Sequence, residues 1–305
     1  MANHITTLWD VHGANLEGHS VMRMAFGFGF SSMRACAILT LIFIVSTPAF
    51  ADGKITISYS ISYLGVTVGS ADWQLSLVAD HYDIEASAQI KGLMSALVDG
   101  QGSGHARGIL SNGGVIPGEF EAHVVTSDEA DTIRMTLHNG AVRQLVALPP
   151  FPPTPERVPL TAALLQGVID PLSASVIPND KLDANVADQC RRVLPLFDGR
   201  RRYDVGLSFK EMREVSIPGD AAEPILVCKL MLTPLAGQQV KSPILHYLVK
   251  GQEIEVSLKP IAEAQILVPV GAAIPMLVGT LHVDPKHVSI EMSGPASGAS
   301  SATRR

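Results

Sequence analysis

The stretch KITISYSISY, residues 54–63, decides the fold class of this chain. Apolar and polar side chains alternate along it without a break: the apolar set is Ile55, Ile57, Tyr59, Ile61 and Tyr63, and the polar set is Thr56, Ser58, Ser60 and Ser62. Because successive side chains of a strand point to opposite faces, this alternation predicts a half-buried β-strand. We therefore expect a sheet that is apolar on one face only.

The same alternation recurs along most of the chain. Trp73, Leu75 and Leu77 in residues 71–79 should join the apolar face, and residues 81–90 continue the pattern. Further strands are predicted at 118–127, 130–138, 141–148, 193–197, 200–209, 225–233, 244–249, 252–259, 264–268, 276–283 and 286–292. Asn139-Gly140 and Asp198-Gly199 are typical hairpin turns. The pattern predicts a mainly β protein with antiparallel strands.

A few segments favour short helices instead. They are residues 92–98 and 160–168, and a further helix beginning at Pro171 with Asp170 as its cap. The glycine-rich stretch GQGSGHARG, residues 100–108, would fit a phosphate-binding loop only if it opened a helix. Because no helical pattern follows it, we interpret it as a strongly bent strand.

Residues 33–51, MRACAILTLIFIVSTPAFA, have the features of a signal peptide. Arg34 supplies the positive charge, an apolar run follows, and Ala49-Phe50-Ala51 matches a cleavage site. The apolar run is shorter than the about 20 residues that span a bilayer. We expect cleavage before Asp52 and export of the mature chain.

The ends of the chain lie outside the expected domain. Residues 1–32 do not fit a signal peptide, and we interpret them as a mis-assigned start or an unstructured extension, with translation starting at Met1, Met22, Met24 or Met33. Residues 52–292 are predicted to form a single mainly β domain. Residues 293–305 are rich in Gly, Ser and Ala and are predicted to be a disordered tail.

Composition excludes some classes of protein. The 305 residues are 47% hydrophobic and 17% charged, which does not fit a disordered chain. The formal net charge of −6 argues against a nucleic-acid-binding protein, which usually carries a basic excess.

Two of the three cysteines remain after the expected cleavage, Cys190 and Cys228. An even pair in an oxidising compartment predicts one disulfide, with two buried free thiols as the alternative. These two are the only site residues that the sequence allows us to name.

Signals for chemistry are weak. His282, Asp284 and His287 form an H-x-D-x-x-H pattern, but in a regular strand this spacing would place the side chains on both faces, so we expect no metal site. No P-loop, H-E-x-x-H or G-x-S-x-G motif is present in the sequence.

Arginines are concentrated around the Asp198-Gly199 turn, at Arg191, Arg192 and 200–202. They could bind an anionic headgroup or a peptidoglycan carboxylate. We favour the alternative of a solvated face in which arginines pair with the neighbouring acids Asp198, Asp204 and Glu211.

Several stretches carry a resemblance to a known family: Asp170-Pro171-Leu172-Ser173-Ala174, FDGRRRY at 197–203, Cys228, YLGVTVG at 63–69 and PMLVGTL at 275–281. Over nearly all of residues 54–292 the chain resembles the Domain of Unknown Function 3108 family of Gram-negative envelope proteins, in the alphaproteobacterial form with paired cysteines. The resemblance implies a strongly curved antiparallel sheet, like a half-barrel or β-spiral and similar to periplasmic lipoprotein carriers. It implies no activity and no functional residue.

Together these observations favour a periplasmic protein that is not an enzyme and needs no cofactor or metal. We expect the concave face of the sheet to hold a lipid or another apolar ligand. An envelope scaffold or adaptor that binds protein or peptidoglycan is the first alternative, and an unrecognised hydrolase is the second. We expect no nucleic-acid partner and no membrane span after signal cleavage.

Overall fold

A computed structural model describes residues 52–90, 100–111, 114–150, 155–179, 186–216 and 222–293, all within one compact unit. The signal peptide, residues 1–32 and the helix predicted at 92–98 lie outside the described residues. So does the predicted tail, apart from its first residue.

Fourteen antiparallel strands form one sheet. In chain order they are β1 (Gly53–Tyr63), β2 (Val66–Val78), β3 (His81–Ile90), β4 (Gly100–Ser111), β5 (Gly114–Thr126), β6 (Ala130–His138), β7 (Ala141–Leu148), β8 (Ile177–Pro178), β9 (Arg192–Phe197), β10 (Arg202–Val215), β11 (Glu223–Ala236), β12 (Ile254–Ile261), β13 (Ile266–Pro275) and β14 (Thr280–Met292). The expected fold class, mainly β with a curved antiparallel sheet, is confirmed.

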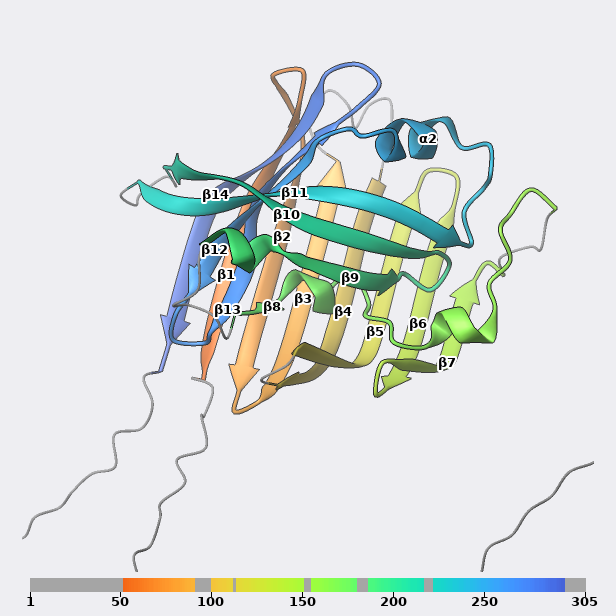
Figure 1. Ribbon diagram of the computed structural model, residues 1–305, viewed down its shortest axis with the longest axis horizontal. Coiled ribbons are helices and arrows are strands. Elements are labelled where there is room, and N and C mark those ends of the chain that lie inside the picture. The colour runs from red at the N-terminus through yellow and green to blue at the C-terminus, as the bar shows by residue number, and fades with distance from the viewer. Residues whose placement is uncertain are drawn as a thin grey trace, which may run out of the picture. The chain divides into compact units, whose positions relative to one another are not determined.

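The first and last strands pair in the middle of the sheet. β1 to β7 are consecutive neighbours, β9 to β14 are likewise, and β1 pairs with β14 from Gly53–Met292 to Tyr63–Leu281. β7 and β9 are therefore the two ends of the strand order, and the sheet is not closed. Figure 1 shows β9–β11 crossing in front of β2–β6. The sheet thus folds back over itself and encloses a core between its two halves.

Bulges contribute to this curvature. The register shifts between Ser58 and Tyr59 in the pairing of β1 with β14, and between Ile61 and Ser62 in its pairing with β2. Similar shifts occur in the β4–β5, β6–β7, β10–β11 and β12–β13 pairs. Each bulge adds one residue to one strand, which bends that strand and increases its twist.

Helices are short and connect strands. They are η2 (Ala162–Leu165), η3 (Ser173–Ser175), α1 (Val186–Cys190) and α2 (Pro243–Val249). η2 occupies only part of the helix predicted at 160–168. In the described part of the chain, no helix is both long and apolar enough to cross a membrane.

One predicted strand is wrong. Residues 244–249 form most of α2, because Pro243 begins the helix and the Ser242 side chain accepts a hydrogen bond from the N–H of Leu245. A short apolar run fits a strand and a buried helix turn equally well, and here the cap and the proline decide.

The two strands predicted at 276–283 and 286–292 are one continuous strand, β14, and residues 276–279 form the turn before it. The register shift opposite Ser58 and Tyr59 falls between Pro285 and His287, so Lys286 is the extra residue of a bulge. A bulge accommodates the missing N–H of Pro285, which would otherwise interrupt a regular ladder.

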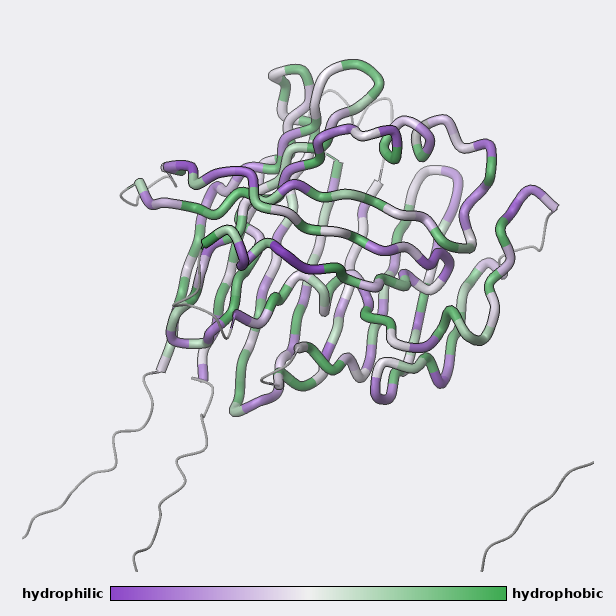
Figure 2. The backbone as a smooth tube through the Cα atoms, in the orientation of Figure 1, coloured by the Kyte–Doolittle hydropathy of each residue, from purple (hydrophilic) through white to green (hydrophobic). Residues whose placement is uncertain are grey.

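The core confirms the alternation read from residues 54–63. Ile55, Ile57 and Tyr59 are buried and pack with Trp73, Leu75 and Leu77 of β2, as predicted. Apolar residues of β11–β13 complete this cluster from the opposite half of the sheet, among them Ile225, Ile261, Ile266 and Val268. Figure 2 shows hydrophobic and hydrophilic residues interleaved along these strands.

Candidate functional site

The connection between β7 and β9 packs into the concave side of the sheet. Residues 168–177 of this connection contribute Val168, Ala174, Val176 and Ile177 to the buried clusters. Two core side chains hold the connection: Trp73 Nε1 donates to Ser175 Oγ at 3.0 Å, and Tyr82 Oη donates to Ser173 Oγ at 2.7 Å. The region around Leu75, which is 0% exposed, is therefore a closed core with no room for a ligand.

A buried carboxylate anchors the same connection. Asp170, the predicted helix cap, accepts hydrogen bonds from the N–H and Oγ of Ser173, and the turn continues as the 3-10 helix η3. Burial raises the pKa of Asp170 to about 6, although its hydrogen bonds act in the opposite direction. Its contacts explain the connection's position, and it does not line a cavity.

An open groove of about 590 Å³ lies where the concave face continues past Tyr59 towards the end of β1. Its walls are apolar and come from six strands and one turn: Ile61, Tyr63, Val68, Ile90, Gly102, Val124, Met276 and Leu281. Its volume falls within the roughly 300–1,000 Å³ that is usual for sites of small ligands.

Small residues in adjacent cross-strand rows leave this groove open. One row runs from Tyr59 through Ala71 and Ala88 to Gly102, and in the next row Ile61 lies opposite Gly69. A Cβ atom on Gly102 would meet Val124 Cγ2 at 3.6 Å, an ordinary contact, so the position has room for a side chain.

Residues 100–108 form part of β4, a strand as predicted. The glycines that alternate along them have two structural roles. Gly100 and Gly102 line the groove. Further along the same face, a Cβ on Gly104 would lie 2.9 Å from Leu172 Cδ1, so this glycine lets the β7–β9 connection pack against the sheet.

None of the described residues that line the groove is charged. Gln89 and Gln101 contribute backbone to the groove, because their side chains share the outer face with Ser87 and Ser103. The polar side chains that line it are Thr126 and Tyr63, and the hydroxyl of Tyr63 donates to the carbonyl oxygen of Val278. Such a surface favours aliphatic groups and offers no ion pair to a charged one.

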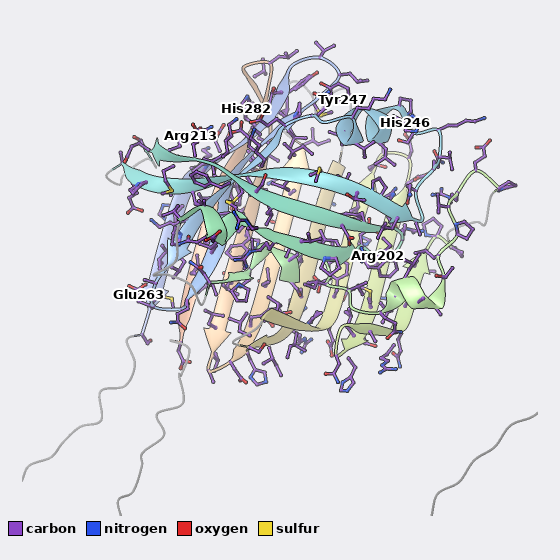
Figure 3. All side chains as sticks on the ribbon, in the orientation of Figure 1. Arg202, Arg213, His246, Tyr247, Glu263 and His282 are labelled. Carbon is purple, nitrogen blue, oxygen red and sulfur yellow. A yellow bond between two sulfur atoms is a disulfide. The ribbon has the colours of Figure 1, made fainter. Side chains whose placement is uncertain are left out.

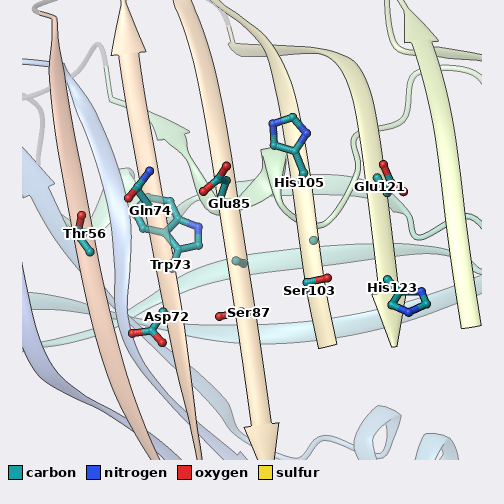
Figure 4. A pocket seen from close by; sticks show the side chains of 12 residues that line it. Thr56, Asp72, Trp73, Gln74, Glu85, Ser87, Ser103, His105, Glu121 and His123 are labelled. Carbon is teal, nitrogen blue, oxygen red and sulfur yellow. The ribbon is translucent and has the colours of Figure 1, made fainter. Parts of the chain in front are cut away.

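The outer face of β1–β5 carries a second, polar hollow of about 580 Å³ (Figure 4). Its side chains form cross-strand rows, one running from Thr56 through Gln74, Glu85 and His105 to Glu121. Two of them have ionic partners, His105 with Asp83 at 3.0 Å and Glu121 with Arg134 at 2.7 Å. No group of three or more metal-ligating side chains is found among the residues that the structure describes.

Comparison with known proteins identifies the family. A family model described as a protein of unknown function, DUF3108, matches residues 58–284. The chain belongs to the DUF3108 family. No curated protein matches its sequence. A solved structure, a β-barrel-like protein of the DUF1849 domain from Brucella abortus, has a TM-score of 0.41 at 8% identity, covering 79% of this chain and 98% of its own.

Two of the stretches that carried the resemblance to DUF3108 border the groove. Tyr63, Val68 and Gly69 come from YLGVTVG, and Met276 and Leu281 come from PMLVGTL. The sequence alone did not single them out as site residues, because their apolar character is equally typical of a core. Their combination of apolar side chains with turn glycines was the available signal.

The cysteine pair of this DUF3108 chain forms the predicted disulfide. Cys190 Sγ and Cys228 Sγ are bonded, linking α1 to β11 (Figure 3). Both residues are fully buried in a cluster with Leu207, Leu226 and Leu258. The bridge is not part of the groove lining and belongs to the core.

The H-x-D-x-x-H residues lie differently from the prediction. His282, Asp284 and His287 pair with Ser62, Ser60 and Ser58, so all three share the outer face. The bulge at Lys286 returns His287 to that face, which regular spacing would not do. The three residues are nevertheless spread along β14 and form no ligand cluster.

The arginines near the Asp198-Gly199 turn have protein partners, as we favoured, but the expected solvated face is wrong for Arg200 and Arg202, which are buried. Arg201 pairs with Asp198 at 3.5 Å, and Arg202 pairs with Asp204 at 2.6 Å. Two partners differ from the expectation: Arg200 binds Asp131 of β6 through two nitrogens, and Glu211 pairs with Arg213. Arg191 pairs with Asp188 of α1, and Arg192 donates to the carbonyl oxygens of Gln189 and Pro178.

Proposed function

We propose that this protein is an exported, periplasmic binding protein that holds an aliphatic ligand, such as one acyl chain of a lipid, in the groove beside Gly102. The observation that carries the proposal is the groove itself: about 590 Å³, open to solvent, and lined by aliphatic side chains without a charge. Monomeric proteins seldom leave such concave apolar surface uncovered unless it binds something. The role is binding, without catalysis.

Export is supported by where the sheet begins. The expected cleavage site precedes Asp52, and β1 starts at Gly53. Removal of residues 1–51 would therefore leave all the strands that the structure describes intact. The buried Cys190–Cys228 bridge also fits an oxidising compartment, where disulfides persist.

The chemistry of the walls restricts the ligand. Val68, Ile90, Val124 and Leu281 offer dispersion contacts to methylene groups, and the absence of charge among the described lining residues gives no partner for a carboxylate or phosphate. An acyl chain therefore lies in the groove and its polar end remains in solvent or at the rim near Thr126.

Titration with cis-parinaric acid, a fluorescent fatty acid, tests this proposal. Gly102→Leu would place a side chain in the groove without displacing the backbone, because the Cβ contacts are ordinary. We expect this variant to lose probe binding by at least about tenfold. Ser103→Leu is the matched control: it adds the same side chain to the next residue of β4, which faces the outer hollow.

Circular dichroism should show that wild type and both variants are folded. Failure of folded wild type to bind the probe, or equal binding by wild type and Gly102→Leu, would contradict the proposal. Native mass spectrometry of the periplasmic protein should in addition detect a co-purified lipid.

A further inference from the structure

Two hairpin tips stand next to each other at the end of the molecule where the groove opens (Figure 1, orange and blue loops at the top). One joins β1 to β2 and the other joins β13 to β14. Four large apolar side chains are exposed there: Leu64 by 61%, Val66 by 51%, Leu277 by 64% and Val278 by 65%. Figure 2 colours parts of both tips as hydrophobic.

The two tips are fixed to each other. Tyr63 Oη of one tip donates to the carbonyl oxygen of Val278 in the other. Within the β13–β14 tip, the N–H of Met276 donates to the carbonyl oxygen of Gly279 at 3.0 Å and closes the turn. A Cβ atom on Gly279 would lie 2.4 Å from Leu64 Cδ2, so the Leu64 side chain packs directly against this glycine of the other tip. The apolar side chains are thus held outward by a built contact between two hairpins.

Charge is missing from this surface. Neither residues 63–69 nor residues 275–281 contain an acidic or basic side chain. The surface is formed by two narrow turns and offers no ion pair that would orient a protein partner, since specific protein interfaces use charged and polar groups to fix their register. Uncharged apolar groups at a protruding end suit the boundary between lipid headgroups and acyl chains.

The surface is also continuous with the groove. Tyr63, Met276 and Leu281 line the groove and belong to the same two hairpins as the exposed tips. We propose that these paired tips insert into the surface of a lipid bilayer and place the mouth of the groove against it. This inference deepens the proposed function and rests on it for its purpose, but the docking itself is measured separately.

Co-sedimentation with phosphatidylcholine vesicles tests the docking. We expect wild type, without residues 1–51, to bind, and the binding to be unchanged between about 0.05 M and about 0.5 M NaCl, because no basic residue contributes. Leu277→Glu combined with Val278→Glu should weaken binding by at least about tenfold. A Trp at position 277 (Leu277→Trp) should shift its emission to the blue when vesicles are added.

Val78→Glu combined with Met231→Glu is the matched control. These side chains are 65% and 68% exposed, but Val78 lies at the opposite end of β2 and Met231 lies in β11. The control should bind vesicles like wild type. The proposal is overturned if wild type does not sediment with vesicles, if the tip variant binds as well as wild type, or if the tips mediate self-association that the tip variant abolishes without vesicles.

The two proposals can fail separately. Binding of cis-parinaric acid in solution by the tip variant, with vesicle binding lost, would support both. Vesicle binding by the Gly102→Leu variant, with probe binding lost, would show that docking is independent of the ligand. If wild type bound the fatty-acid probe but not vesicles, the docking proposal would be overturned and the proposed ligand binding in the groove would stand.

Discussion

Ser173 donates two hydrogen bonds to the buried carboxylate of Asp170, from its N–H to Oδ1 at 2.8 Å and from its Oγ to Oδ2 at 2.5 Å. Both residues are 0% exposed. The pair lies on the concave side of the sheet beside Tyr82, whose hydroxyl donates to the same Ser173 Oγ. A carboxylate in this position must either remain charged without water or hold a proton, and the raised pKa of about 6 indicates that protonation is easy.

The first prediction is that, because of Asp170, the protein has a higher free energy of unfolding near pH 4 than near pH 6. Its pKa is about 6 in the folded state and 3.8 when unperturbed, so between these values the folded chain keeps a proton that the unfolded chain loses. The free energy of unfolding should therefore fall as pH rises from about 4 to about 6, by roughly 1–3 kcal/mol in total. Urea denaturation at several pH values, compared with Asp170→Asn, measures this contribution. Parallel pH profiles for wild type and the variant would contradict it.

The second prediction concerns Arg200, which joins the β9–β10 turn to β6 and to the end of β7. Its side chain is 8% exposed, contacts Asp131 with Nε and Nη2 at 3.1 and 2.5 Å, and donates to the carbonyl oxygen of Pro149 at 2.9 Å. Arg200→Met should lower the free energy of unfolding by about 2 kcal/mol, because hydrogen bonds between charged groups are lost. Chemical denaturation provides the measurement.

An exposed arginine of the same sheet is the control for that prediction. Arg134 pairs with Glu121 at 2.7 Å, but the two side chains are 60% and 47% exposed. Arg134→Met should cost less than about 1 kcal/mol, as is usual for surface ion pairs. Equal losses for the two variants would show that burial of Arg200 adds nothing.

The third prediction is that the disulfide contributes strongly to stability. Cys190 and Cys228 are 38 residues apart, and a closed loop of this length stabilises by about 4 kcal/mol in the chain-entropy model. Cys190→Ser combined with Cys228→Ser should lose an amount of that order, and reduction of wild type after unfolding should have the same effect. If both thiols of protein purified without reductant reacted with an alkylating reagent, the prediction would fail.

Sequence periodicity predicts most of the strands but not the groove. Residues 54–63 alternate so regularly that this strand and its buried face can be predicted. Hairpin turns such as Asn139-Gly140 predict that the strands on either side of them pair. The groove depends instead on strands that are distant in sequence, since Tyr63 and Leu281 meet only because β1 pairs with β14. A single sequence does not contain that pairing.

The errors have local physical causes. Residues 244–249 were assigned to a strand because a short apolar run has no distinguishing period, and a Ser-Pro start outweighed it. His287 was assigned to the wrong face because Lys286 forms a bulge. The partner of Arg200 was missed because Asp131 is 69 residues away in the chain, whereas the acids considered were neighbours in sequence.

The last prediction separates the two roles of the glycines in β4. Gly104→Val should destabilise the protein by about 1–3 kcal/mol, because a Cβ there already lies 2.9 Å from Leu172 Cδ1 and the larger side chain overpacks the connection. Gly102→Val, the same change two residues earlier on the same face, enters the groove and meets Val124 Cγ2 at 3.6 Å. It should leave stability unchanged or raise it slightly, since β-branched residues favour strands.

Leu172→Ala provides the second half of this test. If Gly104→Val acts by colliding with Leu172, the double variant should lose less stability than the sum of the two single changes, with a coupling of at least about 0.5 kcal/mol. Urea denaturation of the four proteins gives the cycle directly. Strict additivity would place the strain elsewhere, and an equal cost for Gly102→Val would mean that the groove is packed as tightly as the core.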